Sequence, residues 1–173
     1  VVFDPHMGAS GEKADLWVPI RPGTDAAAAL AIANVLIEEG LIDVEFLKTR
    51  TNAPSLVNVE TGRILFDETA GKSLYMDADG TPKTYDKCAD PQLEGSFEVN
   101  GVACKTGFTL YKERVAKYTP EYQEEITTVP AATIRQIAKE LGEAAHIGET
   151  IEIDGVTLPY RPAAVDAFSG ITR

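Results

Sequence analysis

The hydrophobic positions of this chain form short continuous runs near the start and helical patterns later, which indicates a mixture of strands and helices. Residues 1–3 and 16–20 are apolar runs without alternation, and a proline follows each run within two residues. Continuous apolar runs are typical of buried parallel strands, and proline cannot donate to a strand ladder. Residues 6–13 contain two glycines and predict a loop between the two strands.

A capped helix is predicted directly after the second strand, over residues 26–39. Thr24 can serve as its N-cap, with the hydroxyl accepting a hydrogen bond from an otherwise unpaired backbone N–H. Asp25 lies in the first turn, where a negative charge suits the positive end of the helix dipole. Gly40 is the expected C-terminal cap.

The pattern changes to β-rich runs separated by turn dipeptides from residue 52 to residue 106. The turn signals are Thr61-Gly62, Asp79-Gly80 and Asn100-Gly101. Such dipeptides between β-rich runs predict hairpins. Asp154-Gly155, between the apolar runs 151–153 and 156–158, predicts one more hairpin.

The other helices are predicted from caps and from the helical spacing of apolar residues. They cover residues 44–49 after a capping Asp43, residues 109–117, a segment that begins at Thr119-Pro120, and a segment that begins at Val129-Pro130.

Composition narrows the function classes. The 173 residues are 44% hydrophobic and 25% charged, an ordinary globular balance, and 27 acidic against 16 basic residues give a net charge of -11. Such a surface repels phosphate backbones and anionic lipid, so nucleic acid and membranes are poor partners. No run is long and apolar enough to span a bilayer and no signal peptide is evident, so the segment is expected to be soluble. Cys88 and Cys104 fit neither a disulfide framework nor an iron–sulfur motif and are expected to be free thiols.

Polar residues at the ends of the two predicted strands form the candidate site. Ligands of doubly wound sheets lie outside the carboxyl ends of strands, and Asp4 occupies such an end. Arg21 can face a phosphate, Gly23 lets the backbone approach a ligand, and the next helix begins with free N–H groups that suit an anion. Asp25 offers two oxygens to the adjacent N1–H and N2–H donors of guanine, a donor pair that adenine lacks.

Each of these residues also has an ordinary structural explanation. Thr24 and Asp25 are common at helix starts, and Asp4 stands in a common turn sequence. The acids Asp77 and Asp79 lack the later ligands of a calcium loop and predict a simple turn.

Several segments resemble the dimethyl sulfoxide reductase family, which comprises molybdopterin oxidoreductases with a bis-molybdopterin guanine dinucleotide cofactor. The guanosine-binding signature of the family is similar to residues 2–5 (VFDP), Ser10 and residues 14–25 (ADLWVPIRPGTD), the last run matching almost residue for residue. Later similarities are residues 37–41 (IEEGL), 118–121 (YTPE), 125–130 (EITTVP) and 152–162 (EIDGVTLPYRP). The last segment resembles a branch with acetylene hydratase and thiosulfate-reductase-like enzymes.

The resemblance implies roles for individual residues. The guanosine diphosphate end of one pterin cofactor would be held by Asp4, Arg21, Gly23, Thr24 and Asp25, and Ser10 stands where the family often has Thr near the same nucleotide. His6 replaces the usual Arg, so no phosphate clamp is assigned to it. The metal ligand of the family normally lies upstream of this segment, as do the iron–sulfur cysteines of many members. No catalytic and no metal-ligating residue is therefore assigned here.

The predicted function is that of the cofactor-binding segment of a molybdenum or tungsten oxidoreductase catalytic subunit. The whole enzyme would perform two-electron redox chemistry or oxygen-atom transfer, and the segment alone is expected to be inactive. The expected partners are an electron-transfer subunit and the remainder of the catalytic subunit, whose N-terminal part could hold an iron–sulfur cluster. The alternatives are a hydratase-type tungsten enzyme without net redox change, a stand-alone guanine-nucleotide-binding module, and a structural domain without a ligand.

The predicted fold class is α/β, with a doubly wound, mostly parallel, Rossmann-like sheet and a β-hairpin-rich insertion. Its parts are a nucleotide-binding α/β core (1–51), a hairpin and loop insertion (52–106), a helical return to the core (107–150), and a hairpin with a proline-containing tail (151–173). The chain opens on Val1 without an initiator methionine, so we expect it to be a fragment of a larger catalytic polypeptide.

Overall fold

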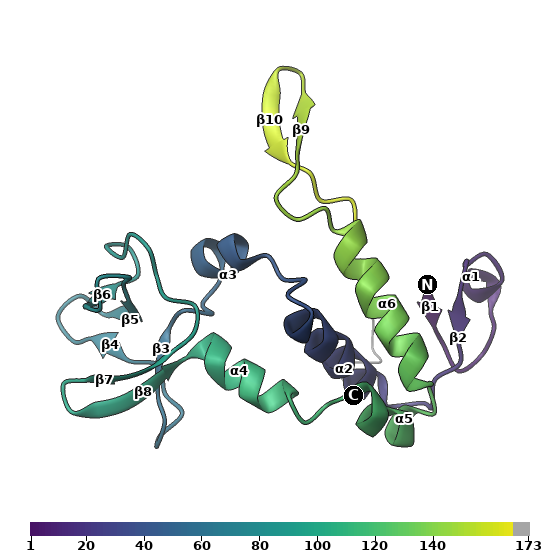
Figure 1. Ribbon diagram of the computed structural model, residues 1–173, viewed down its shortest axis with the longest axis horizontal. Helices are drawn as coiled ribbons and strands as arrows, with labels where there is room; N and C mark the ends of the chain where they lie inside the picture. Colours follow the sequence, from purple (N-terminus) through teal and green to yellow (C-terminus); the bar gives the residue numbers. More distant parts are fainter. Residues whose placement is uncertain (168–173) are drawn as a thin grey trace. The chain divides into compact units, whose positions relative to one another are not determined.

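The computed structural model describes residues 1–167 and is a mixture of helices and strands (Figure 1). The chain forms two compact units. Unit 1 contains Val1–Ile42 and the chain from Val115 onward, and unit 2 contains Asp43–Arg114. Each unit has a hydrophobic core of its own.

Unit 1 opens with two short parallel strands. Strand β1 (Val2–Phe3) pairs with β2 (Trp17–Val18), in the register Val2 to Trp17 and Phe3 to Val18. Val18 is buried, and Phe3 packs against the core. The first two apolar runs are thus confirmed as neighbouring parallel strands.

The stretch between these strands is only partly the loop that the sequence predicts. One helical turn, α1 (Ala9–Glu12), forms within it. Gly11 lies in this turn, and a Cβ atom there would be 3.2 Å from Cδ1 of the Trp17 indole. The prediction of a loop was wrong for residues 9–12 only, because a glycine needed for close packing looks the same in sequence as one needed for a turn.

A larger parallel sheet is not confirmed within residues 1–167. Besides β1 and β2, the described strands form a three-stranded sheet in the order β3-β8-β7, another in the order β4-β5-β6, and the β9-β10 pair, and all of these pairs are antiparallel. The prediction of a protein with both helices and strands is therefore confirmed, but the large parallel sheet is not.

Three helices form the body of unit 1 (Figure 1). They are α2 (Asp25–Glu38), α5 (Pro120–Thr127) and α6 (Ala131–Ala144), and each contacts the other two. Alanines in the core face of α2 allow a close approach. The buried core residues are Val18, Ile20, Ala28, Ala31, Val129, Ile134 and Ile137. A Cβ atom at Gly142 of α6 would lie 2.8 Å from the Leu41 side chain, so this contact tolerates only glycine without rearrangement.

The α5–α6 connection is built around a buried polar network. The Gln123 side-chain amide donates to the carbonyl oxygens of Pro120 at 3.0 Å and Val129 at 2.9 Å. Its oxygen accepts the Thr127 hydroxyl at 2.6 Å, and that hydroxyl oxygen accepts the Val129 N–H at 3.0 Å. The Thr127 carbonyl in turn accepts the backbone N–H of Arg21 at 3.0 Å. The network therefore fixes the α5–α6 connection and ties the loop before α2 to it.

The N-terminal caps predicted at Asp43 and Thr119 are confirmed. Asp43 accepts the Phe46 N–H at 2.8 Å at the start of α3 (Val44–Arg50), and Thr119 accepts the Tyr122 N–H at 3.2 Å at the start of α5. Gly40, just beyond α2, has a φ of 70°, which suits a glycine at a helix C-terminus.

Unit 2 consists of two small antiparallel sheets and flanking helices (Figure 1). One sheet contains β3 (Leu56–Asn58), β7 (Ser96–Val99) and β8 (Val102–Thr106), and the other contains β4 (Phe66–Asp67), β5 (Lys72–Met76) and β6 (Pro82–Thr84). The helix α4 (Gly107–Val115) follows β8 and begins two residues earlier than predicted. The buried residues Leu56, Met76, Val99 and Cys104 form the core of this unit.

Two of the three hairpins predicted in this region join paired strands, whereas at Thr61-Gly62 the chain turns back through an isolated antiparallel bridge between Val57 and Ile64. Asn100 and Gly101 join β7 to β8 with φ values of 51° and 77°, as a two-residue turn between twisted strands requires. The β5–β6 hairpin turns at Asp79-Gly80, where Gly80 has a φ of 80°.

The acidic turn of the β5–β6 hairpin is held by one lysine. Lys83 Nζ lies 2.6 Å from Oδ2 of Asp77 and 2.6 Å from Oδ2 of Asp79. The Asp77 side chain is only 6% exposed, whereas that of Asp79 is 54% exposed. The hydrogen bond from Lys83 holds the pKa of Asp77 well below its usual range, with further help from backbone N–H donors. The predicted simple turn is confirmed.

The hairpin of β9 (Thr150–Ile153) and β10 (Val156–Pro159) has one apolar and one polar face. Its register pairs Ile151 with Leu158 and Ile153 with Val156, so these four side chains share a face. They are between 39% and 56% exposed. Among residues 1–167, no helix has the length and apolar character needed to cross a membrane.

The Gln123→Leu substitution is predicted to lower the free energy of unfolding by about 2 kcal/mol, because it leaves buried carbonyl and hydroxyl groups without partners. Denaturant unfolding of the full chain measures this loss. The matched control is Gln136→Leu, because Gln136 is exposed on α6 and its amide bonds only to Glu140. The control is expected to change stability by less than about 0.5 kcal/mol. Equal losses in both variants would contradict a structural role for the network.

The Asp77→Asn substitution is predicted to reduce the acid sensitivity of unit 2. Because the folded pKa of Asp77 is depressed, its stabilisation is complete above the unfolded pKa of about 4 and is lost as the pH falls toward the folded pKa. The variant should unfold more easily at neutral pH and lose less stability below about pH 4. Thermal unfolding from neutral to acidic pH checks this. Asp79→Asn is the control, and its effect should be smaller because the Asp79 carboxylate is largely in water.

Candidate functional site

The carboxyl ends of β1 and β2 lie at the same edge, because the two strands are parallel. Asp4 follows β1, and its N–H donates to the Val18 carbonyl at 3.2 Å. The Trp17 indole donates to the Asp4 carbonyl at 2.9 Å. One carboxylate oxygen of Asp4 accepts the His6 N–H at 2.8 Å, and the residue is exposed. Within residues 1–167, the second carboxylate oxygen accepts no hydrogen bond.

The loop from Arg21 to Thr24, which follows β2 in the chain, forms a tight turn. Its first residue is anchored by the hydrogen bond from the Arg21 N–H to the Thr127 carbonyl. The Thr24 N–H and hydroxyl both donate to the Arg21 carbonyl, at 3.3 Å and 2.7 Å. Gly23 has a φ of 77°, in the left-handed region that favours glycine, and a Cβ atom there would meet nothing within 4 Å.

The predicted capping role of the Thr24 hydroxyl is wrong. Thr24 does occupy the N-cap position of α2, but its side chain makes no capping hydrogen bond. The hydroxyl donates backward to Arg21 instead. Because the hydroxyl does not cap the helix, it accepts no hydrogen bond from the first N–H groups of α2.

The start of α2 therefore has free donors, and the basic residue Arg21 precedes it by four positions in the chain. Within residues 1–167, the N–H groups of Gly23, Asp25 and Ala26 donate to no backbone acceptor. Free N–H groups and the helix dipole make such an end attractive to an anion. Asp25 is half-buried in the first turn, and Arg21 is exposed.

Five of the six predicted site residues follow the carboxyl end of β1 or β2 along the chain. Asp4 comes directly after β1, and the loop with Arg21, Gly23, Thr24 and Asp25 comes after β2. Ser10 lies between the two strands, on α1, and is exposed.

Two residues that position this edge are not apparent as site residues from the sequence. Trp17 holds the Asp4 carbonyl, and the chain contains a single tryptophan, which is a signal that could have drawn attention to it. Thr127 holds Arg21 from a helix far along the chain, and no local pattern signals this contact.

The two cysteines are free, as predicted. Cys104 is buried in the core of unit 2, and burial raises its pKa. Burial, followed by the charge of Asp77, raises the pKa of Cys88 to about 11. Neither thiol has the lowered pKa of a nucleophile. In the described part of the chain, no group of three or more His, Cys, Asp or Glu side chains could hold a metal ion.

Comparison with known proteins finds relatives along most of the chain. It is 39% identical to a sulfite dehydrogenase component of Allochromatium vinosum over 84% of this chain and 17% of that protein. It is 32% identical to the catalytic component of a putative dimethyl sulfoxide reductase of Halobacterium salinarum over 80% of this chain and 18% of that protein. The chain therefore spans less than a fifth of the length of these relatives.

One solved structure with partial similarity is acetylene hydratase from Pelobacter acetylenicus. The identity is 27%, the match covers 80% of this chain and 12% of that chain, and the TM-score of 0.45 is too low to support a fold assignment. No family model matches the sequence.

The Gly23→Ala substitution is predicted to cost about 1 kcal/mol of stability, because an L-residue is strained in the left-handed conformation even where space is available. Denaturant unfolding measures the cost. The control is Gly8→Ala, because Gly8 has a φ of -91° and its added Cβ would also meet nothing within 4 Å. A loss as large at Gly8 as at Gly23 would rule out backbone strain as the cause.

Proposed function

The chain belongs to the dimethyl sulfoxide reductase family of molybdopterin oxidoreductases, and we propose that it is the segment that holds the guanine dinucleotide end of the cofactor. The observation that carries this proposal is the loop from Arg21 to Asp25. It combines an exposed guanidinium, a left-handed glycine and free N–H groups at the start of α2.

The chemistry of this loop fits a diphosphate. A guanidinium presents several donors in a fixed fork that matches phosphate oxygens, and helix N–H groups add donors that carry no side-chain entropy. Because Gly23 has no side chain and the space beside it is open, a ligand could approach the backbone closely. The residues therefore fit the phosphate part of the cofactor.

The carboxylates fit the guanosine part. The Asp25 side chain makes no hydrogen bond or ion pair within residues 1–167, and one oxygen of Asp4 is also free. Two carboxylate oxygens can accept the N1–H and N2–H donors of guanine, and a second carboxylate can accept ribose hydroxyls. The guanine dinucleotide form of the cofactor is therefore favoured over an adenine form. Ser10 and Thr24 complete the proposed binding set.

The catalytic chemistry is proposed for the whole subunit. The bound molybdenum or tungsten cofactor would supply two-electron redox chemistry or oxygen-atom transfer, while the protein orients it. Residues of this chain bind and place one end of the cofactor. The metal ligand and any iron–sulfur cluster would belong to other parts of the subunit.

The same proposal accounts for two open features of unit 1. Strands β1 and β2 have two residues each, which is too short for an independently stable sheet, and further strands of the subunit would extend them into a doubly wound sheet. The apolar face of the β9–β10 hairpin would pack against the remainder of the subunit, since exposed apolar clusters mark contact surfaces.

An electron-transfer subunit is a further proposed partner. The proposed parts remain the core (1–51), the insertion (52–106), the helical return (107–150) and the tail (151–173).

The Asp25→Asn substitution in the complete catalytic subunit tests the proposal. The amide cannot accept two guanine N–H groups, so retention of the cofactor should fall about tenfold or more. Acid release of guanine nucleotide from the purified subunit measures the loss. The control is Glu143→Gln, which removes one negative charge from an exposed position on α6.

Full guanine content in the folded Asp25→Asn subunit would contradict the proposed role. Titration of the 173-residue chain with guanosine diphosphate distinguishes the cofactor-binding segment from a stand-alone guanine-nucleotide-binding module. Strong binding of the free nucleotide without pterin would favour the stand-alone module.

A further inference from the structure

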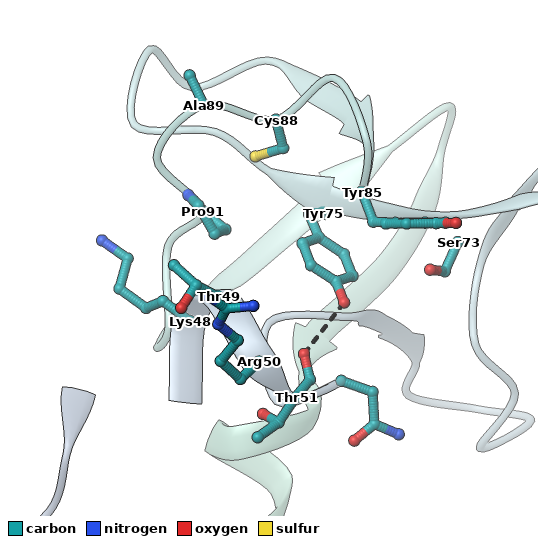
Figure 2. Close-up of a pocket in the computed structure, with 11 residues that line it drawn as sticks. Lys48, Thr49, Arg50, Thr51, Ser73, Tyr75, Tyr85, Cys88, Ala89 and Pro91 are labelled. Atoms are coloured by element: carbon teal, nitrogen blue, oxygen red, sulfur yellow. Dashed lines mark hydrogen bonds between the residues drawn. The ribbon is translucent and has the colours of Figure 1, made fainter. Parts of the chain in front are cut away.

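Unit 2 contains an open cavity of about 650 Å³, within the size range of sites for small organic ligands (Figure 2). The end of α3 and the loop after it form one wall, as residues 48–52. Residues of β5 and Tyr85 form a second wall, and the segment 88–91 forms the third. None of these residues belongs to the loop proposed to hold the cofactor.

The charged side chains that line this cavity are Lys48 and Arg50, both basic, although the chain contains 27 acidic and 16 basic residues. Lys48 is paired with Asp90, whose side chain is 62% exposed. The Arg50 guanidinium makes no ion pair and no hydrogen bond within residues 1–167. Because Asp90 neutralises Lys48 and the charge of Asp77 acts on Cys88, the attraction for an anion comes from close contact with the Arg50 guanidinium.

Two tyrosine rings line the cavity beside these basic residues. Figure 2 shows the Tyr75 ring between the segment with Thr51 and the loop with Cys88. The Tyr75 hydroxyl lies 3.3 Å from the Thr51 carbonyl and donates to it, which fixes the direction of the ring. The Tyr75 and Tyr85 ring centroids are 6.4 Å apart, with the planes at 48°. Tyr75 is 9% exposed and Tyr85 is 52% exposed, so Tyr85 has ring surface left to cover.

The remaining polar groups are neutral. The Ser73 hydroxyl has no hydrogen-bond partner in the described part of the chain, so it can serve a ligand. Burial raises the pKa of Cys88 to about 11, so its thiol stays protonated at neutral pH and adds no negative charge. The net character of the lining is thus basic, aromatic and hydroxylic.

We propose that this cavity binds a small organic anion with a planar ring, of which an aromatic carboxylate is the simplest kind. The carboxylate would take the unpaired Arg50 guanidinium, and the ring would lie against Tyr75 and Tyr85. A guanidinium pairs with a carboxylate through two parallel hydrogen bonds, and aromatic rings attract each other in offset or edge-to-face arrangements. This site does not depend on the cofactor proposal, because all its residues are in unit 2.

Titration of the full 173-residue chain with benzoate, followed by ligand-observed NMR at constant ionic strength, tests the proposal. Benzoate should bind, while benzamide, the neutral analogue of the same shape, and acetate, which lacks the ring, should bind at least about tenfold more weakly. Arg50→Gln should weaken benzoate binding by a similar factor. Arg63→Gln is the matched control, because Arg63 is an exposed arginine of the same unit outside the cavity.

Because Arg50 is exposed, its replacement should leave folding intact, and the unfolding midpoint of each variant verifies this. Tyr85→Leu provides a second variant, which should lower the affinity for benzoate more than the affinity for acetate. Equal affinity for benzoate and benzamide, unchanged affinity in Arg50→Gln, or no binding of benzoate at millimolar concentration would overturn the proposal.

Discussion

The hydrogen bond from the Arg21 N–H to the Thr127 carbonyl is the contact on which the geometry of unit 1 depends. It joins the loop before α2 to the end of α5, and the Gln123 side chain holds that end in place by bonding to Thr127 and Val129. Because Gln123, Thr127 and Val129 are fully buried, water cannot replace these bonds without opening the core. The position of the loop is therefore set by a helix connection distant in the sequence.

This anchoring leaves the donors of the loop available. The Thr24 hydroxyl bonds back to the Arg21 carbonyl, and within residues 1–167 the N–H groups of Asp25 and Ala26 at the start of α2 stay unpaired. In a monomeric fold such groups are usually capped by a side chain. A helix end that keeps its donors beside an exposed arginine is arranged for an anionic ligand, which is the basis for placing a diphosphate there.

In this acidic chain, the neighbours of a basic side chain decide whether it is available to bind an anion. Most lysines of unit 2 are paired with acids, as Lys72 is with Asp86 and Lys83 is with Asp77 and Asp79. Within residues 1–167, Arg50 has no such partner, and it lines the cavity of unit 2. With a net charge of -11, the chain repels anions at long range, so an anion would bind only where close contacts outweigh that repulsion.

Patterns of neighbouring residues were enough to predict the helix caps and turns of this chain and its family resemblance. Caps such as Asp43 and Thr119, turn dipeptides such as Asn100-Gly101, and the run over residues 14–25 depend on neighbours in the chain, so their signals are local. The folded arrangement was needed to reveal that the Thr24 hydroxyl bonds back to Arg21 and that the Thr127 carbonyl accepts the Arg21 N–H. It also decided that Arg50 and Tyr85 would share a cavity. These outcomes depend on pairings between distant segments, which no pattern along the chain encodes.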